Sequence, residues 1–88
     1  MNVIFRRSFA KDLKKIRQKA LRQAIQAVIE QLEQRSSLAD IPNVKSLTSE
    51  GAYYRIRIGD YRLGLLVEGD TVTVIRFLHR RDIYRYFP

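Results

Sequence analysis

The sequence predicts an α+β fold in which an N-terminal strand and a helical hairpin precede a three-stranded antiparallel meander. Apolar residues recur at helical spacing from Phe9 to Gln34, whereas residues 53–78 alternate apolar and polar side chains. Gly-Asp pairs at 59–60 and 69–70 divide the alternating region, as two-residue turns do. We therefore expect one domain, residues 1–88, with the helices laid on one face of the sheet in two layers.

Residues 1–7 predict the first strand, with Val3 and Phe5 on one side and Ile4 on the other. Ser8 follows as a suitable N-cap for a helix. The helical pattern would give a rod of about 40 Å as a single helix, which is too long for so small a domain. We therefore expect two helices with a break near Gln18–Ala20, although neither Gly nor Pro marks that break.

Residues 36–49 predict an irregular connection, because Pro42 and Asn43 favour turns. Three apolar residues are expected to fold this connection onto the core: Ile41, Val44 and Leu47. A turn at Glu50-Gly51 then leads into the meander.

The first hairpin of the meander gathers arginines. A turn at Gly59-Asp60 pairs Arg57 with Arg62 and Arg55 with Gly64, so the three arginines share one face. The other face is apolar and is formed by Tyr54, Ile56, Ile58, Leu63 and Leu65. Like charges in opposition destabilise a sheet. We therefore interpret the arginine face as open and suited to phosphate, with a merely solvated face as the alternative.

The second hairpin leaves one alternative open. Its register through the Gly69-Asp70 turn pairs Leu65 with Val74 and Leu63 with Arg76, which places Arg76 on the helix-facing side. Either Arg76 reaches solvent at the margin of the sheet, or a β-bulge turns it to the other face.

The composition favours a small cytoplasmic protein that binds nucleic acid. The 17 Lys and Arg against nine Asp and Glu give a net charge of +8, which is typical of such proteins. An acidic protein partner or a merely soluble basic surface would also account for this charge. The chain has no cysteine for disulfides or thiolate metal sites, and no apolar segment long enough to span a membrane or serve as a signal peptide.

Three segments, residues 54–58, 60–63 and 78–84, read Tyr-Arg-Ile-Arg-Ile, Asp-Tyr-Arg-Leu and Leu-His-Arg-Arg-Asp-Ile-Tyr. With the order of elements, they resemble the RelE side of the RelE/ParE superfamily of bacterial toxin–antitoxin modules. The resemblance implies an endoribonuclease that cleaves mRNA in the ribosomal A site and that a co-expressed antitoxin holds inactive. The implied partners are this antitoxin, mRNA and the ribosome with its rRNA.

The resemblance also implies which residues act. Basic residues before the hairpin turn fall on Arg55 and Arg57, the arginine of the next strand on Arg62, and the arginine after the last strand on Arg81. The expected C-terminal tyrosine falls on Tyr84 or Tyr86, of which we favour Tyr84.

RNA carries its own nucleophile in the 2′-OH, so we expect metal-free chemistry with no cofactor. Arg62 and Arg81 would hold the non-bridging phosphate oxygens. Flanking phosphates would contact Arg55, Arg57, Lys45 and Arg80. Proton transfer would fall to His79, the only histidine, or to Tyr84, which could instead stack on a base.

Two other functions remain open from the sequence: a ParE-like toxin that inhibits DNA gyrase without nuclease activity, and a non-catalytic RNA- or ribosome-binding module. Single residues also have structural alternatives, since His79 could cap or pack the strand end and Tyr84 could border the core. The lysines of the helical region, Lys11, Lys14, Lys15 and Lys19, are expected to form a solvated helix face.

Overall fold

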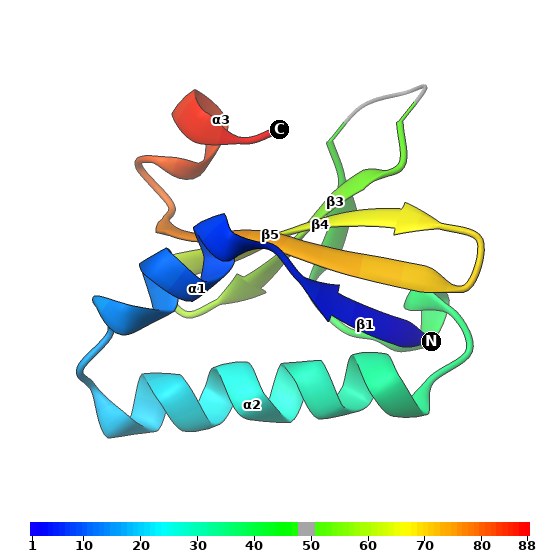
Figure 1. The fold of residues 1–88 in the computed structure, drawn as a ribbon, viewed down its shortest axis with the longest axis horizontal. Helices are drawn as coiled ribbons and strands as arrows, with labels where there is room; N and C mark the ends of the chain where they lie inside the picture. Colours follow the sequence, from blue (N-terminus) through cyan, green and yellow to red (C-terminus); the bar gives the residue numbers. More distant parts are fainter. Residues whose placement is uncertain (48–50) are drawn as a thin grey trace.

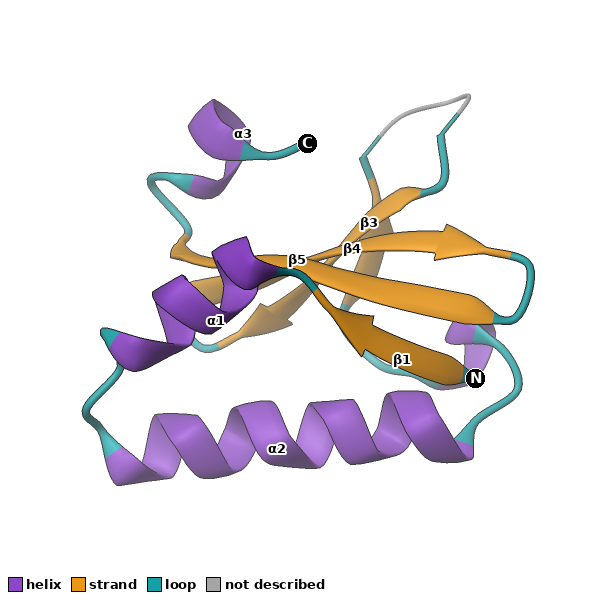
Figure 2. Ribbon diagram, viewed as in Figure 1, coloured by secondary structure: helices purple, strands orange, loops and turns teal. Residues whose placement is uncertain are grey.

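The computed structural model describes residues 1–47 and 51–88, which form a five-stranded sheet with its longest helix on one side and a short C-terminal helix on the other (Figure 1, Figure 2). The elements are β1 (Asn2–Phe5), α1 (Arg7–Lys14), α2 (Lys19–Gln34), the 3-10 helix η1 (Leu38–Asp40), β2 (Val44–Ser46), β3 (Tyr53–Ile58), β4 (Tyr61–Glu68), β5 (Thr71–His79) and α3 (Ile83–Tyr86). The strand order is β1-β5-β4-β3-β2, with β1 parallel to β5 and the other pairs antiparallel. The expected α+β fold is confirmed.

The helical hairpin is also confirmed, but its break lies at residues 15–18, slightly earlier than expected. A side chain from the second helix binds the backbone at this break. Arg22 Nη1 of α2 donates to the carbonyl oxygens of Leu13, at 2.9 Å, and Ile16, at 2.7 Å. The Leu13 carbonyl also accepts from the Ile16 backbone N–H at 3.0 Å, so backbone and Arg22 together satisfy the end of α1 without Gly or Pro.

The expected N-cap at Ser8 is wrong. Helix α1 begins at Arg7, its N-cap residue Arg6 makes no side-chain capping bond, and Ser8 Oγ donates instead to the carbonyl oxygen of Ile75 in β5. The serine hydroxyl therefore ties α1 to the sheet.

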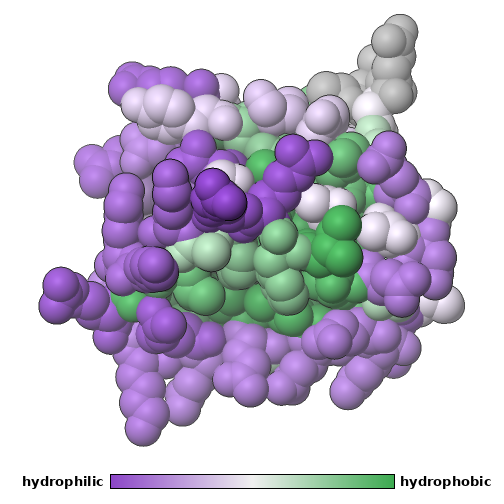
Figure 3. Space-filling model, in the orientation of Figure 1, coloured by the Kyte–Doolittle hydropathy of each residue, from purple (hydrophilic) through white to green (hydrophobic). Residues whose placement is uncertain are grey.

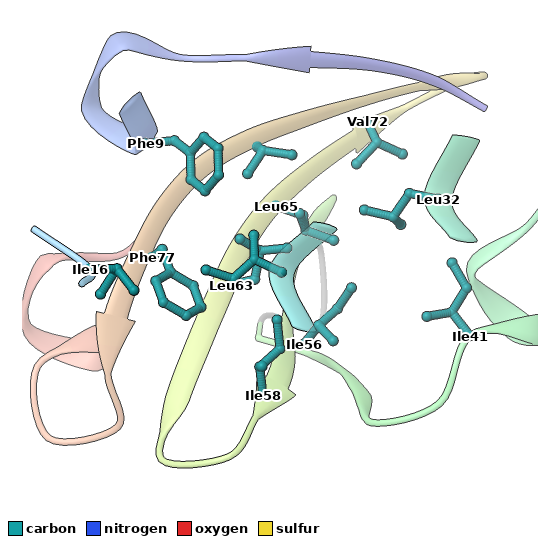
Figure 4. Close-up of a cluster of buried hydrophobic side chains, with 12 residues drawn as sticks. Phe9, Ile16, Leu32, Ile41, Ile56, Ile58, Leu63, Leu65, Val72 and Phe77 are labelled. Carbon is teal, nitrogen blue, oxygen red and sulfur yellow. The ribbon is translucent and has the colours of Figure 1, made fainter. Parts of the chain in front are cut away.

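The core lies between α2 and the helix-facing side of the sheet (Figure 4). Leu32 of α2 gathers with Ile41 and Val72 at one end, and Ile16 lies beside Phe77 at the other. The expected apolar face of the first hairpin belongs to this cluster, since Ile56, Ile58, Leu63 and Leu65 are buried and Tyr54 packs against them. No helix in the described part of the chain is long and apolar enough to cross a membrane.

The irregular connection contains a strand that the sequence analysis did not predict. Strand β2 pairs with β3 and places Lys45 opposite Arg55. Three residues are too few for a period-two pattern to stand out. Ile41 is buried, and Val44 packs against the core as expected. The end of the connection and the Glu50 part of the expected turn lie outside the described residues.

A β-bulge decides the position of Arg76. The pairings of Arg57 with Arg62, Arg55 with Gly64 and Leu65 with Val74 occur as expected. Between Gly64 and Leu65 the register with β5 shifts, so that Leu63 faces Phe77 and not Arg76. The predicted Leu63–Arg76 pair is therefore wrong, and the alternative of a bulge is confirmed. Phe77 enters the core, and Arg76 lies opposite Gly64 on the arginine-bearing face.

Helix α1 covers the part of the β5 edge that β1 leaves free. The buried carboxylate of Asp12 accepts hydrogen bonds from the backbone N–H of Phe77, at 2.9 Å, and from Arg76 Nε, at 2.8 Å. The second carboxylate oxygen accepts from Arg76 Nη2 at 3.1 Å. These bonds raise the pKa of the Arg76 guanidinium. One acidic side chain thus satisfies an edge N–H group and neutralises the cation beside it.

An apolar strip is visible between α2 and the pair formed by β1 and α1 (Figure 3). On β1, Ile4 and Phe5 are each about half exposed, at 52% and 53%. The Phe5 ring also stacks on Phe9, with ring centroids 5.6 Å apart. Helix α3 lies on the opposite side of the sheet from α2 (Figure 1), so this strip is separate from the C-terminal tail.

Candidate nucleic-acid interface

The sheet face opposite α2 carries two rows of residues in register. The first row crosses β2 to β5 and consists of Lys45, Arg55, Gly64 and Arg76. The second row crosses β3 to β5 and consists of Arg57, Arg62 and Leu78. Directly opposed residues share a face of the sheet. The missed strand β2 therefore adds Lys45 to the three arginines predicted from the hairpin, and we call Lys45, Arg55, Arg57 and Arg62 the arginine cluster.

The cluster is not neutralised from within. In the described residues, the only carboxylate within ion-pair distance of a Lys or Arg is that of Asp12, and its partner is Arg76. Burial and then the charge of Arg55 lower the pKa of Arg62, and Arg57 and Arg80 act in the same direction. The Arg62 guanidinium donates from Nη1 to the carbonyl oxygens of Gly59, at 3.0 Å, and Tyr61, at 2.9 Å. An anion at this position would therefore relieve the repulsion.

Asn43 holds two of the arginines and was predicted only as a turn-former. Its carbonyl oxygen accepts from Arg55 Nη1, at 3.4 Å, and from the Arg57 backbone N–H, at 3.1 Å. Its side-chain Oδ1 accepts from Arg57 Nη2 at 3.2 Å. The residue has a φ of 66°, a left-handed conformation that asparagine tolerates better than most residues. The cluster, Asn43 and Val44 line a hollow of about 390 Å³.

Tyr84 lies against the cluster, and Tyr86 does not. The Tyr84 hydroxyl accepts from Arg55 Nε at 3.3 Å, and Tyr84 opposes the effect of the neighbouring arginines by raising the pKa of Arg62. Its side chain is 60% exposed. The Tyr86 ring instead lies under Arg76, whose Cζ is 5.9 Å from the ring centroid.

The two arginines after β5, Arg80 and Arg81, interact with different residues. Arg80 lies near enough to Arg62 to lower its pKa, and its backbone N–H donates to the Asp60 carbonyl at 2.7 Å. Arg81 donates from its backbone N–H to His79 Nδ1 at 3.2 Å and also from Nε at 3.4 Å. The structure thus joins Arg80, rather than Arg81, to the cluster.

His79 is placed apart from Arg62. It faces Tyr61 in the register, one position from the Arg62–Leu78 pair, and its ring meets Tyr61 edge to face with centroids 5.4 Å apart. Because side chains alternate across a sheet, His79 and Arg62 emerge on opposite faces. In the described residues, no three His, Cys, Asp or Glu side chains form a group that could hold a metal ion.

The C-terminal tail covers part of the face that was expected to be open. Ile83 and Phe87 are buried at 0% and 3% exposure, yet they lie outside the main core cluster. A Cβ placed on Gly64 would lie 2.9 Å from three atoms of the Phe87 ring. Gly64 thus makes room for the tail, a role that no local pattern of the sequence signals.

Comparison with known proteins places the chain among toxins. The family model for the ParE toxin of the type II toxin–antitoxin system parDE matches residues 3–84. The chain is 43% identical to "Toxin RelE3" of Methanocaldococcus jannaschii over 89 residues, which cover 100% of both proteins.

Solved structures agree with this relationship. The RelB–RelE antitoxin–toxin complex of Methanococcus jannaschii contains a chain 40% identical, with a TM-score of 0.81 over 97% of this chain and 99% of that one. The archaeal RelE–RelB complex of Pyrococcus horikoshii OT3 gives a TM-score of 0.74 at 23% identity, covering 90% and 93% of the two chains. The second similarity concerns the fold alone.

Proposed function

Since the chain belongs to the ParE toxin family of type II toxin–antitoxin systems and is a RelE-like toxin, we propose that it is an mRNA interferase. It cleaves mRNA in the ribosomal A site and thereby inhibits translation. The observation that carries this proposal is the arginine cluster, whose cations have no carboxylate partner in the described residues. Guanidinium groups bind phosphate oxygens in a bidentate manner, and RNA is the phosphate polymer that brings its own nucleophile.

The reaction follows from the groups present. The 2′-oxygen attacks the adjacent phosphorus and loses its proton, while the bond from phosphorus to the 5′-oxygen breaks and that oxygen gains a proton. The products are a 2′,3′-cyclic phosphate and a 5′-OH. Arg62 and Arg55 stabilise the charge that develops on the non-bridging oxygens. The positive charge needed in this step comes from the protein itself, so the proposal requires no metal ion.

Tyr84 is the proton-transfer candidate that lies nearest this charge, because its hydroxyl already contacts Arg55. Phosphates on either side of the cleaved bond contact Arg57, Lys45 and Arg80. Arg81 and His79 form a second group of candidate RNA-binding residues. They contact the RNA only where the RNA chain passes the end of β5.

The partner that restrains this activity is a cognate antitoxin. The relatives from M. jannaschii and P. horikoshii were solved as RelB–RelE complexes. A net charge of +8 favours an antitoxin with an acidic binding segment. We propose that this antitoxin blocks access of RNA to the cluster.

A second candidate function is inhibition of DNA gyrase, because the matching family model is that of the ParE toxin. A gyrase inhibitor binds a protein and needs no chemistry at the arginine cluster. Substitution of Arg62 would then leave toxicity unchanged unless Arg62 itself contacts gyrase.

Expression of the chain followed by mapping of the 5′ ends of cellular messages separates these functions. We expect new 5′ ends in frame with the codons, and we expect them to disappear in Arg62→Ala but persist in Arg17→Ala, an exposed arginine between α1 and α2. The Arg81→Ala variant tests the second group. Intact messages with double-strand breaks or altered supercoiling would indicate gyrase, and intact messages and DNA with stalled translation would indicate a binding module.

A further inference from the structure

Three residues of the C-terminal tail lie on the first row of the arginine-bearing face. Three positions of that row lie side by side on β3, β4 and β5: Arg55, Gly64 and Arg76. The Tyr84 hydroxyl contacts Arg55 Nε, Phe87 lies on Gly64, and Arg76 lies over the ring of Tyr86. The side chain of Phe87 thus occupies the position between the two arginines, and a tyrosine contacts the arginine on each side.

Packing of Phe87 is tight. The ring is 3% exposed and meets Tyr53 edge to face at 82°, with centroids 5.7 Å apart. A methyl group on Gly64 would lie only 2.9 Å from three ring atoms, which is too close without movement of the tail. The missing side chain at position 64 is therefore what admits the ring.

Helix α3 depends on such anchors. Its four residues are too few to form a stable helix by themselves. Ile83 fixes the beginning of the helix, being fully buried, and Phe87 fixes the residue directly after its end. Between these anchors the Tyr84 side chain is mostly exposed, and its hydroxyl accepts a hydrogen bond from Arg55 Nε of the sheet at 3.3 Å.

We propose that Phe87, seated on Gly64, is a positioning residue that fixes the Tyr84 hydroxyl against the arginine cluster. This inference rests on the proposed ribonuclease function for its consequence, but not for its geometry. Phe87 is buried and does not reach substrate; it acts through the tail. Removal of the Phe87 ring, or addition of a methyl group at position 64, would free Tyr84. The sheet, and hence the arginine cluster, would stay in place.

The geometric half is testable without RNA. Proton NMR of the folded chain should show nuclear Overhauser contacts between the Tyr84 ring and the Arg55 side chain. We expect Phe87→Ala to abolish these contacts and to preserve the cross-strand contacts of β3 and β4. Gly64→Ala keeps the Phe87 ring but fills the space in which it packs. This variant should also abolish the Tyr84–Arg55 contacts and preserve those between β3 and β4. Persistence of the Tyr84–Arg55 contacts in both variants would overturn the proposal.

The functional half is tested by single-turnover and steady-state cleavage of an RNA substrate. We expect Phe87→Ala and Gly64→Ala each to lower kcat by about 10²-fold with little change in KM, since misplacement of a reacting group has effects of this size. The double variant Phe87→Ala with Tyr84→Phe should be no slower than either single variant. A merely destabilising change would add to the effect of Tyr84→Phe, so additivity would count against positioning.

A size exchange provides the rescue. Phe87→Leu in the Gly64→Ala background removes ring atoms where the new methyl group needs space, and it should recover part of the lost kcat. If Phe87→Ala loses the Tyr84–Arg55 NMR contacts but cleaves RNA at the normal rate, the positioning role is overturned. The proposed ribonuclease function would then still stand. If the unmodified chain cleaves no RNA, the proposed function fails, and the NMR contacts alone support or overturn the placement of Tyr84 by Phe87.

Discussion

Arg57 of β3 and Arg62 of β4 occupy directly opposite positions on the same face of the sheet, and no carboxylate in the described residues lies within ion-pair distance of either. The pair costs stability in the free protein, because opposed like charges repel. Burial and the neighbouring arginines also lower the pKa of Arg62, as expected for a cation placed among like charges. Repulsion of this kind is best tolerated in a protein whose bound partner is a polyanion, because the bound negative charge offsets the repulsion.

Arg57→Thr should therefore stabilise the protein and weaken its binding to RNA. Threonine suits a strand and removes the repulsion, so we expect the free energy of unfolding to rise by about 0.5 kcal/mol. Urea denaturation measures this change. The slope of the logarithm of RNA affinity against the logarithm of salt concentration should fall by about one, since one phosphate contact is lost. Arg17→Thr is the control, and an equal change of slope there would mean that the cluster is not the binding site.

The register of this pair was predictable because it is set locally. The Gly-Asp turns fix which residues oppose each other, and the period-two pattern fixes which face each residue occupies. The helical hairpin followed from the periodicity of residues 9–34 in the same way, although its break depends on Arg22, whose contacts with Leu13 and Ile16 no local pattern reveals.

Features that depend on distant residues were not predictable in this way. The bulge that reorients Arg76 is supported by Asp12, 64 positions away. Tail packing on Gly64 joins residues far apart in sequence, and strand β2 is only three residues long. Arg81 was grouped with Arg62 through the family resemblance, and His79 was added as the only histidine. Alternation across β5 instead places His79 on the other face from Arg62.

Asn43→Asp should weaken RNA binding while preserving the fold. The aspartate has nearly the same shape, but its carboxylate would neutralise Arg57 and repel phosphate in the same hollow. A single charge a few ångströms from a phosphate changes the binding free energy by about 1–2 kcal/mol, so affinity should fall about tenfold. Fluorescence anisotropy with a short labelled RNA measures this loss.

Asn43→Gly is the matched control for that change. Glycine adopts the left-handed conformation at φ 66° without strain, and it keeps the carbonyl oxygen that accepts from Arg55. We expect a smaller loss of affinity than with aspartate, because only the hydrogen bond to Arg57 Nη2 disappears. An equal loss in both variants would show that the side-chain contact, and not the added charge, is responsible.

Asp12→Ala should destabilise the fold without acting on the cluster directly. The substitution leaves the Phe77 N–H without its acceptor and removes the partner of Arg76. Loss of hydrogen bonds to a buried charged group costs about 2–3 kcal/mol, which urea denaturation would detect as a lower midpoint with unchanged slope. Glu33→Ala, at an exposed position of α2, should change stability little. Similar midpoints for the two variants would contradict the role assigned to Asp12.

Tyr84→Phe and Tyr86→Phe distinguish the two tyrosines of the tail. Each substitution removes one hydroxyl and keeps the ring, so packing is preserved. Only the Tyr84 hydroxyl contacts the cluster, through Arg55 Nε, whereas Tyr86 meets Arg76 through its ring face. We therefore expect RNA cleavage to fall about 10²-fold in Tyr84→Phe, the usual scale of a proton-transfer contribution, and to change little in Tyr86→Phe. The reverse order would assign the chemistry to Tyr86, and equal small effects would leave stacking on RNA bases as the role of Tyr84, because phenylalanine stacks as well as tyrosine.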